Sequence, residues 1–477
     1  MEWKQLLSTK RQRDHSNGKI YKSADLRSEF EKDYHRIVGS ASFRRLQDKT
    51  QVFPLDKSDF IRTRLTHSLE VSSIAKSLGQ NIGENILTYK KDLNFTVQMK
   101  EDMCNILQCS GLIHDIGNPP FGHFGEEAIR KWFQIHLPKI QYQGATVHDT
   151  LLPQMREDFY HFEGNAQALR LVTKLHFLVD ENGMNLTYAL LNTIIKYPVS
   201  SLEINKKSGN IKDKKMGYYF ADGEIFEDIQ RVTGTNGRRH PLTFILEAAD
   251  DIAYKTADIE DAFVKGFLSY HTLREELKVL KANTNEADST GTRIDPLEIL
   301  DRQYERGLKQ GVVNIEEYAV KNWIVRIQGF IINCATFGFT TNYKTIMAGE
   351  YKKDLFYGTY GEQLMNLLGD LAYRRVFSSN AIYKVEVKES VILNHLMNLF
   401  VGTVLKYDTD MELDALDVRV MSFVSDNYIN IYHHRAAGKS EAEKLYLRLL
   451  LVTDYICGMT DSYALRLYQE IQGLGDI

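Results

Sequence analysis

Residues 114–128 have the sequence HDIGNPPFGHFGEEA. This order of residues is not typical of a purely structural segment. His114 and Asp115 carry side chains that bind metal ions. The prolines that follow cannot continue a helical hydrogen-bond ladder, and the glycines allow tight turns and close approach to a ligand. A second histidine, His123, then stands three residues ahead of Glu126. We interpret this stretch as part of a chemical site.

The sequence around this stretch carries apolar residues at three- and four-residue spacing, which is the period of an α-helix. Only eight prolines occur in 477 residues, and 43% of the residues are hydrophobic. The best alternating, strand-like pattern is VEVKESVIL at 385–393. We therefore predict a mainly α protein, a large helical fold with very few short strands. The clearest helical segments are MCNILQCSGLIHDIG (103–117), FEGNAQALRLVTKLHFLV (162–179) and LTFILEAADDIAYKTADIEDAF (242–263).

The overall charge and the hydropathy pattern argue against several classes of protein. The chain has 59 basic and 63 acidic residues and a formal net charge of -4. This overall charge does not indicate binding to nucleic acid or to a membrane surface. The N-terminal segment is charged throughout and lacks the apolar core of a signal peptide. No run of about 20 apolar residues occurs, and the four cysteines show no CxxC spacing. We expect a reduced, cytoplasmic protein without membrane association.

Polar breaks in the sequence suggest a division of the chain. One such break is ANTNEADSTGTRIDP at 282–296, a composition typical of a connecting loop. We expect an N-terminal extension at 1–35, a core at 36–281, the polar connecting loop at 282–296, and a helical region at 297–477 that packs on the core. Every motif with recognisable chemistry falls before the connecting loop.

Four residues on three apolar, helical segments form a candidate metal site: His67 in RTRLTHSLEV, His114 and Asp115 in GLIHDIG, and Asp250 in ILEAADDIAY. Ionisable groups on such faces are costly to bury unless they are paired or coordinated. A lone histidine in a helix is more often a hydrogen-bonded core or surface residue, and only the four residues together indicate a ligand set. Two imidazoles and two carboxylates suit Mn, Mg or Fe, with Zn less suited.

The order H…HD…D resembles the signature of the HD-domain metal-dependent phosphohydrolases. Longer blocks are similar to those of bacterial deoxyguanosine triphosphate triphosphohydrolases (dGTPases), in the same order along most of the chain. Segments 131–160 and 270–370 resemble that family weakly. The similar blocks are RLQDKTQVFPLD, RTRLTHSLEV, HDIGNPPFGHFGEEAI, HFEGNAQALRLV, IIKYP, KKMGYY, EAADDIAYKTADIEDA, RRVFSS and DYICGMTDSYA.

This resemblance implies hydrolysis of a deoxynucleoside triphosphate, dGTP first among them, to a deoxynucleoside and inorganic triphosphate. It implies that one divalent metal ion per site is held by His67, His114, Asp115 and Asp250, and that the core at 36–281 is the catalytic HD domain. Proteins of this family form homo-oligomers, often hexamers or tetramers, with dNTP or single-stranded DNA effectors. The base preference, dGTP alone or mixed dNTPs, stays open.

The stretch after the His-Asp pair is interpreted as a catalytic turn. We expect Pro119 and Pro120 to end the helix that carries the pair, and the glycines to bring His123 back over the metal. The departing 5′-oxygen needs a proton, and His123 is the candidate donor. Glu126 can orient the imidazole and support its charged form. The alternative is a plain proline-glycine loop with an exposed histidine.

Residues Asp250, Tyr254 and Asp258 are spaced i, i+4 and i+8 and therefore share one face of a helix. At about 1.5 Å per residue they span roughly 12 Å, comparable to the distance from an α-phosphate to a sugar edge. The resemblance implies that Tyr254 packs against the deoxyribose where a 2′-hydroxyl would lie, and that Asp258 and Gln51 hold the 3′-hydroxyl. Without the resemblance, such a Tyr-Asp pair is equally well surface decoration.

The resemblance also implies which residues contact the triphosphate. Arg64 stands three residues before His67, on the same predicted helix. Lys215 lies in a lysine-rich loop where most side chains are simply solvated, and that alternative stays open. His161, which lies next to the segment FEGN (162–165), is a candidate proton relay or a helix cap. The residues implied to contact the phosphates are Arg64, Asn165, Lys196, Tyr197 and Lys215.

Two other functions remain as alternatives. The first is an HD phosphohydrolase that acts on a signalling nucleotide, although Tyr254 would obstruct a ribose. The second is a nucleotide-sensing or single-stranded DNA-binding scaffold with a decayed HD site. Basic clusters at 10–13, at 238–239 and in the loop 206–215 leave room for an accessory anion or DNA surface.

Overall fold

The computed structural model describes residues 1–13, 25–51, 62–176, 181–283 and 294–474. The described chain is mainly helical, as predicted, and its strands are one antiparallel pair, β1 (Gln141–Tyr142) and β2 (Ala145–Thr146). The helices of the N-terminal part are α1 (Trp3–Leu6), α2 (Glu29–Val38), α3 (Ala41–Arg45), α4 (Arg64–Asn85), α5 (Val97–Ile113), α6 (Gly122–His136), α7 (Val147–Thr150), α8 (Pro153–Tyr160), α9 (Gly164–Arg170), α10 (Tyr188–Ile194), α11 (Gly223–Thr233), α12 (Pro241–Val264) and α13 (Tyr270–Asn283).

The C-terminal part continues the helical architecture. Its helices are α14 (Pro296–Gln310), α15 (Ile315–Thr341), α16 (Tyr343–Ala348), α17 (Tyr360–Ala372), α18 (Asn380–Val404), α19 (Ala415–Met421), α20 (Asp426–Ala436), α21 (Glu441–Cys457) and α22 (Asp461–Ile471). Short 3-10 or π segments join the helices at η1 (Leu46–Asp48), η2 (Ile86–Lys90), η3 (Leu171–Leu175), η4 (Ser201–Glu203), η5 (Lys206–Ser208), η6 (Ile211–Asp213), η7 (Phe220–Asp222) and η8 (Tyr373–Phe377). Of the expected connecting loop at 282–296, residues 284–293 lie outside the described chain.

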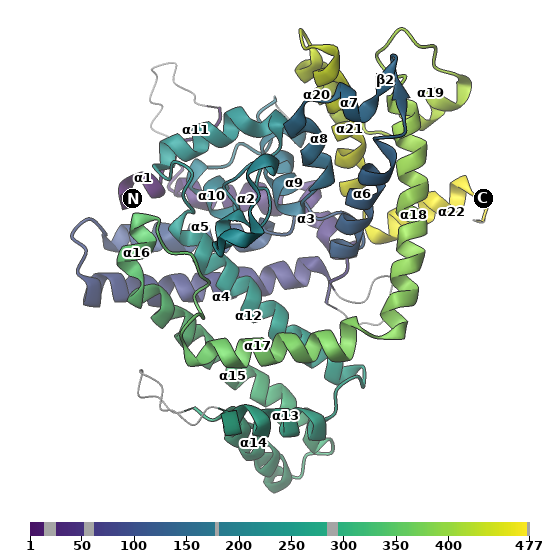
Figure 1. Cartoon of the computed structure of the whole chain (residues 1–477). Helices are drawn as coiled ribbons and strands as arrows, with labels where there is room; N and C mark the ends of the chain where they lie inside the picture. Colours follow the sequence, from purple (N-terminus) through teal and green to yellow (C-terminus); the bar gives the residue numbers. More distant parts are fainter. Residues whose placement is uncertain (14–24, 52–61, 177–180, 284–293, 475–477) are drawn as a thin grey trace.

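The predicted strand at 385–393 is wrong, because this segment lies inside the long helix α18. Ile392, Leu396 and Phe400 are buried at i, i+4 and i+8 spacing. That stripe packs α18 against α6, α21 and α22. Helical burial of one face therefore outweighs the β-propensity of the valines, which depends strongly on context. Figure 1 shows α18 along one side of the molecule, where it lies beside α6, a helix far from it in sequence.

Three helices, α4, α5 and α12, pack against one another at the centre of the N-terminal part (Figure 1). A Cβ atom added to Gly111 of α5 would lie 2.5 Å from the Cα of Ser72 in α4. Glycine at this position therefore lets the two helices approach closely. The helix starts are specified locally: Thr63 caps α4 through the N–H of Thr66, and Pro241 occupies the first turn of α12, where proline is tolerated. Of the predicted metal ligands, His67 lies on α4 and Asp250 on α12, and His114 and Asp115 directly follow the end of α5.

Two arginines from the predicted basic clusters lie inside the protein. Arg11 is almost fully buried and donates to Asp33 at 2.6 Å. Arg239 is also buried and forms an ion pair with Glu247. Neither guanidinium is therefore available to an anion at the surface. None of the helices in the described part of the chain combines the length and the apolar character needed to cross a membrane.

Candidate metal centre and active site

The four predicted metal ligands converge at one point between α4, the end of α5, and α12. The Nε2 atoms of His67 and His114 lie 3.2 and 3.3 Å from the same oxygen, Oδ1 of Asp250. His114 Nε2 is also 3.6 Å from Asp115 Oδ1. Donor atoms of His67, His114 and Asp115 all lie within 4.8 Å of one another. Side chains that are 183 residues apart in sequence thus present nitrogen and oxygen atoms to one small volume.

The ring of His114 is held in the orientation and tautomer that a metal ligand requires. Its Nδ1 donates to the carbonyl oxygen of Gly111 at 2.8 Å, which leaves the Nε2 lone pair pointing at the cluster. That Nε2 is buried and has no hydrogen-bond partner within the described chain. A buried acceptor without a partner is costly, and coordination of a cation removes the cost. A carbonyl behind a histidine is a common support for a metal ligand, so these residues fit a divalent metal ion.

Both carboxylates of the cluster are held in the charged form despite their surroundings. Burial raises the pKa of Asp115, but His114 and Arg64 outweigh burial and bring the pKa well below its usual range. Burial likewise raises the pKa of Asp250, and Lys196 and His114 reverse that effect. Arg64 donates to Asp115 Oδ2, and Lys196 donates to Asp250 Oδ2 at 2.9 Å. The site is therefore ready to bind a cation with ionised oxygens.

The chain turns sharply after the His-Asp pair, but the helix ends earlier than expected. Helix α5 ends at Ile113, so His114 and Asp115 already lie in the turn and Pro119–Pro120 do not end the helix. The next helix, α6, begins at Gly122 after Phe121 and Gly122 adopt φ values of 65° and 60°. This left-handed conformation is unfavourable for phenylalanine and ordinary for glycine. Ending α5 at Ile113 frees the pair to face the cluster.

His123 and Glu126 form the expected pair at the start of α6. His123 Nδ1 lies 3.2 Å from Glu126 Oε2, and Glu126 Oε1 accepts the N–H of Gly164 at 2.8 Å. The His123 side chain is 78% exposed whereas that of Glu126 is 1% exposed. The hydrogen bond to Glu126 raises the pKa of His123. A buried, fixed carboxylate thus orients a solvent-accessible imidazole and favours its protonated form.

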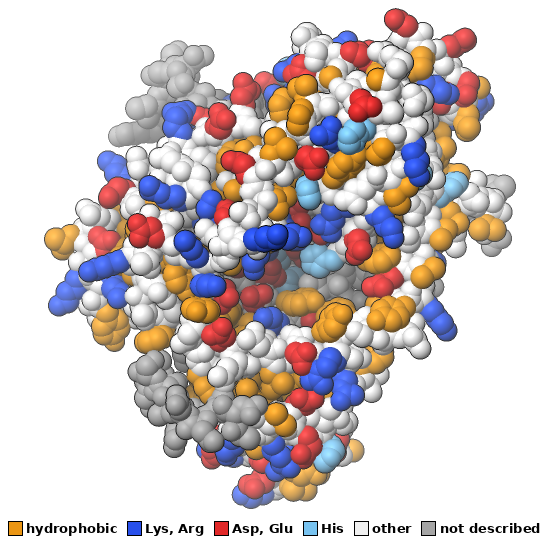
Figure 2. Space-filling model, viewed as in Figure 1, with side chains coloured by type: hydrophobic (Ala, Val, Ile, Leu, Met, Phe, Trp, Pro, Cys, Tyr) orange, Lys and Arg blue, Asp and Glu red, His pale blue; other side chains and the backbone are white. Residues whose placement is uncertain are grey.

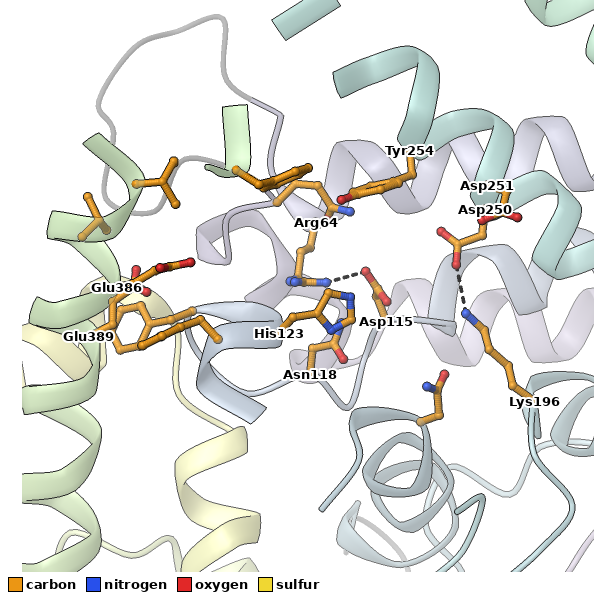
Figure 3. A pocket seen from close by; sticks show the side chains of 17 residues that line it. Arg64, Asp115, Asn118, His123, Lys196, Asp250, Asp251, Tyr254, Glu386 and Glu389 are labelled. Atoms are coloured by element: carbon orange, nitrogen blue, oxygen red, sulfur yellow. Dashed lines mark hydrogen bonds and ion pairs between the residues drawn. The ribbon is translucent and has the colours of Figure 1, made fainter. Parts of the chain in front are cut away.

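A cleft of about 380 Å³ opens beside the cluster. Figure 2 shows it as a hollow in the middle of one face, with histidine inside and lysine and arginine along its rim. In Figure 3, Lys196 and Asp250 lie on one side, His123 and Arg64 lie between, and Glu386 and Glu389 lie on the opposite side. The lining residues are Gln51, Arg64, Asp115, Asn118, Phe121, His123, Phe124, Asn165, Lys196, Asp250, Asp251, Tyr254, Phe377, Ile382, Val385, Glu386 and Glu389.

Most residues that were expected to bind substrate lie in this cleft. Asp258 lies one helical turn beyond Tyr254, is buried, and has two carboxylate oxygens without a hydrogen-bond partner in the described chain. Burial raises the pKa of Asp258 to about 8, so a hydroxyl group that donates to it would be a favourable partner. The expected residues that line the cleft are Gln51, Arg64, Asn165, Lys196 and Tyr254.

Three other residues lie outside the cleft lining. Lys215 forms an ion pair with the buried Glu163 at 2.9 Å. That carboxylate also accepts from Asn165 Nδ2 at 2.7 Å, so Lys215 is linked to the cleft through Asn165. Tyr197 follows Lys196 but does not line the cleft. His161 lies 3.5 Å from Glu157, one turn earlier in α8. This contact gives the His161 side chain a partner, so no proton relay is needed to explain its position.

The C-terminal part contributes cleft residues that sequence reasoning missed. Phe377 of η8 stacks near Tyr254, with ring centroids 6.3 Å apart and an interplanar angle of 15°. Glu386 and Glu389 enter from α18. The block RRVFSS contains Phe377 and was one available signal. The two glutamates fall in the segment interpreted as a strand, where they would face opposite sides. In the helix they are i and i+3 and share one face.

The helical fold and the two-histidine, two-carboxylate cluster define an HD-domain phosphohydrolase. Residues 64–177 match the HD domain, and residues 428–470 match the phosphohydrolase-associated domain. Asp250, the fourth member of the cluster, lies outside both matches. HD domains bind divalent metal ions, in agreement with the donor set of the cluster.

Full-length similarity narrows the class to a family. A deoxyguanosinetriphosphate triphosphohydrolase-like protein of Listeria innocua is 46% identical over 99% of this chain and 100% of its own length. A protein of the same name from Synechocystis is 32% identical over 99% of this chain and 100% of its own length. The deoxyguanosinetriphosphate triphosphohydrolase of Yersinia enterocolitica is 31% identical over 93% of each chain. The chain belongs to this family of deoxyguanosinetriphosphate triphosphohydrolase-like proteins.

Removal of a cluster residue is expected to abolish metal binding. His67→Ala and Asp115→Ala each delete one of the four converging donors, and each should reduce bound Mn or Mg to background in elemental analysis. His271→Ala, at an exposed histidine of α13, is the control and should keep the metal. Retention of stoichiometric metal by both cluster variants would contradict the ligand assignment.

Proposed function

We propose that the protein hydrolyses deoxynucleoside triphosphates, dGTP foremost, to the deoxynucleoside and inorganic triphosphate. The observation that carries the proposal is one cleft that joins the metal cluster, the His123–Glu126 pair and a far end of aromatic and carboxylate side chains. A nucleotide substrate requires one region for its phosphates, one for the leaving oxygen and one for its base. The names of the full-length relatives support the same substrate.

The phosphate end of the cleft is preorganised for a charged substrate. His67, His114, Asp115 and Asp250 would hold a divalent cation, which would supply Lewis-acid polarisation to a bound phosphate. Arg64 and Lys196 line the cleft and are fixed by the carboxylates of the same cluster. Fixed positive charges cost no reorganisation when a polyphosphate binds.

Hydrolysis then needs a proton for the leaving group. Water attacks the α-phosphorus, the bond from phosphorus to the 5′-oxygen breaks, and the 5′-oxygen takes up a proton. His123 can donate that proton from its exposed ring, because Glu126 holds Nδ1 and leaves Nε2 on the side of the cleft. Glu126 stabilises the imidazolium before transfer, and a general acid of this kind fits the direction of the pKa shift.

The middle of the cleft supports a deoxyribose. Tyr254 lines this region, with Phe377 nearly parallel to it. A tyrosine ring against the sugar leaves no partner for a 2′-hydroxyl, so a ribonucleotide would bury that group at a cost. Asp258 and Gln51 each have a buried side-chain oxygen without a partner in the described chain. These oxygens are suited to accept the 3′-hydroxyl.

The far end of the cleft supports guanine as the preferred base. Glu389 is buried, and its Oε1 has no hydrogen-bond partner within the described residues. Burial raises the pKa of Glu389 to about 9, so the ionised form becomes favourable when a ligand brings N–H donors. Guanine presents two adjacent donors, N1–H and N2–H, that match the two oxygens of a carboxylate. The other three bases present at most one donor beside an acceptor.

We also propose that the protein assembles into a homo-oligomer. Tyr383, Val387 and Val391 form an exposed apolar row at i, i+4 and i+8 spacing on α18. Exposed apolar patches often mark interfaces. A DNA-binding scaffold receives less support, because Arg11 and Arg239 from the predicted basic clusters are buried in ion pairs.

Product analysis tests the proposed reaction. With Mn or Mg, dGTP should give deoxyguanosine and triphosphate, and GTP should be cleaved far more slowly because of Tyr254. The measurement is chromatography of the products from the four dNTPs and GTP, alone and in pairs, since one dNTP could act as an effector for another. Release of monophosphate and pyrophosphate, or equal use of GTP, would contradict the proposal.

Loss of the proton donor should lower turnover without removing the metal. His123→Ala should reduce kcat by about 10²- to 10⁴-fold while metal content and dNTP affinity stay nearly unchanged. Glu126→Gln should cause a smaller loss. It should also shift the alkaline limb of the kcat profile to lower pH, because Glu126 raises the pKa of His123 and so keeps the acid protonated to higher pH. Full turnover in metal-loaded His123→Ala would refute this role.

Replacement of Glu389 should change base preference selectively. Glu389→Gln substitutes an amide NH2 for one acceptor, so kcat/KM for dGTP should fall about 10- to 100-fold, as expected for one mismatched buried hydrogen bond of 1–3 kcal/mol. Glu386→Gln is the matched control and should have a smaller effect, because Glu386 is only partly buried. An equal loss for all four dNTPs in Glu389→Gln would exclude base recognition.

A further inference from the structure

A buried carboxylate at the start of α22 binds two segments of the active site at once. Asp461 is 1% exposed. Its Oδ1 accepts the backbone N–H of Phe121 at 2.9 Å. Its Oδ2 accepts the N–H of Thr50 at 2.9 Å and the hydroxyl of Thr50 at 2.6 Å. These bonds span 340 and 411 residues of sequence, so the C-terminal part holds both segments.

Each of the two segments leads directly into the cleft. Thr50 precedes Gln51, and Phe121 stands two residues before His123; Gln51 and His123 both line the cleft. The segments belong to different parts of the catalytic core, and Asp461 fixes their relative position. One side chain thus sets the distance between a proposed sugar ligand and the proposed proton donor.

A second buried charge supports the same arrangement. Lys49 is 2% exposed, and its Nζ donates to the carbonyl oxygens of Asn118 at 2.6 Å and Cys457 at 2.7 Å. Asn118 begins the turn whose end Asp461 holds at Phe121. The turn is therefore attached at both ends to residues 457–461, which lie within the segment that matches the phosphohydrolase-associated domain.

The turn needs such an attachment for a physical reason. Phe121 has a φ of 65°, and a left-handed conformation is unfavourable for a non-glycine residue. Phe121 is also buried, so its N–H without an acceptor would add a further energetic cost. Asp461 supplies the acceptor and so stabilises the unfavourable conformation. The direction in which α6 starts, and with it the position of His123, depends on this conformation.

We infer that Asp461 is a positioning residue for the proposed hydrolysis: by holding the Phe121 turn against the Gln51 segment, it places His123 for proton transfer. The inference rests on the proposed function. It assigns the phosphohydrolase-associated segment a direct part in the active site, without contact between Asp461 and the substrate.

Asp461→Asn separates the two halves of this contact. The asparagine side chain has one acceptor oxygen instead of two. Thr50 offers two donors, its N–H and its hydroxyl, whereas Phe121 offers only its N–H. The amide oxygen should stay with Thr50, and the NH2 group should then face the N–H of Phe121. We expect kcat to fall by about 10- to 100-fold, as for a misplaced catalytic group, with KM and metal content little changed. Ser462→Ala, which removes only an exposed bond to Asp48, should leave all three unchanged.

A double-mutant cycle with His123→Ala shows whether Asp461 acts through His123. In the His123→Ala background, Asp461→Asn should cause almost no further loss of kcat, because the misplaced group is already absent. Equal, additive losses in the two backgrounds would mean that Asp461 only stabilises the fold, and they would overturn the inference. Unchanged kcat in Asp461→Asn alone would overturn it as well.

Hydrogen exchange provides a readout that does not depend on the reaction. In the full-length protein without substrate, the amides at 121–125 should exchange faster in Asp461→Asn than in the wild type or in Ser462→Ala. If the wild type releases no triphosphate from any dNTP, the proposed function fails, and the exchange still tests the attachment of the turn. Unchanged exchange would overturn the attachment. If Asp461→Asn does not fold, Lys49→Met tests the turn from its Asn118 end with the same expectations.

Discussion

The rest of the structure depends on two buried imidazoles and two partly buried carboxylates that meet at one point between apolar helices. Such groups are costly to bury unless opposite charges or a cation compensate them. The chain meets this requirement with close packing of α4 on α5 at Gly111, a carbonyl that fixes His114, and the basic side chains Arg64 and Lys196 beside the carboxylates. The resulting set of nitrogen and oxygen donors fits a divalent cation.

The proposed chemistry is divided between buried and exposed groups. His114 and Glu126 are fixed by hydrogen bonds to the backbone, and Asp115 and Asp250 by Arg64 and Lys196, whereas His123 reaches into the cleft with an exposed ring. The fixed Glu126 carboxylate raises the pKa of His123 and leaves the exposed ring accessible from the cleft. The left-handed turn before α6 makes this geometry possible, and the buried Asp461 stabilises that turn from the other end of the chain.

The C-terminal part completes the site. Helix α18 forms the far end of the cleft with Glu386 and Glu389, and the start of α22 holds the turn that precedes α6. Residues on both sides of the expected connecting loop at 282–296 therefore line the same cleft. A cleft that is closed by a second set of helices gives its far end an environment of its own, in which burial, together with the carboxylates of Asp461 and Glu386, raises the pKa of Glu389.

Local patterns in the sequence determined the helical class and the types and identities of the converging ligands, because helical periodicity and ligand chemistry are short-range properties. They also indicated the His123–Glu126 pair, which is only three residues apart. Tertiary structure decided the rest. It placed the end of α5 at Ile113, and it made a helix of 385–393 by burying one face of that segment. It also brought Glu389 and Asp461 to the cleft and its turn, because contacts across more than 300 residues leave no trace in local periodicity.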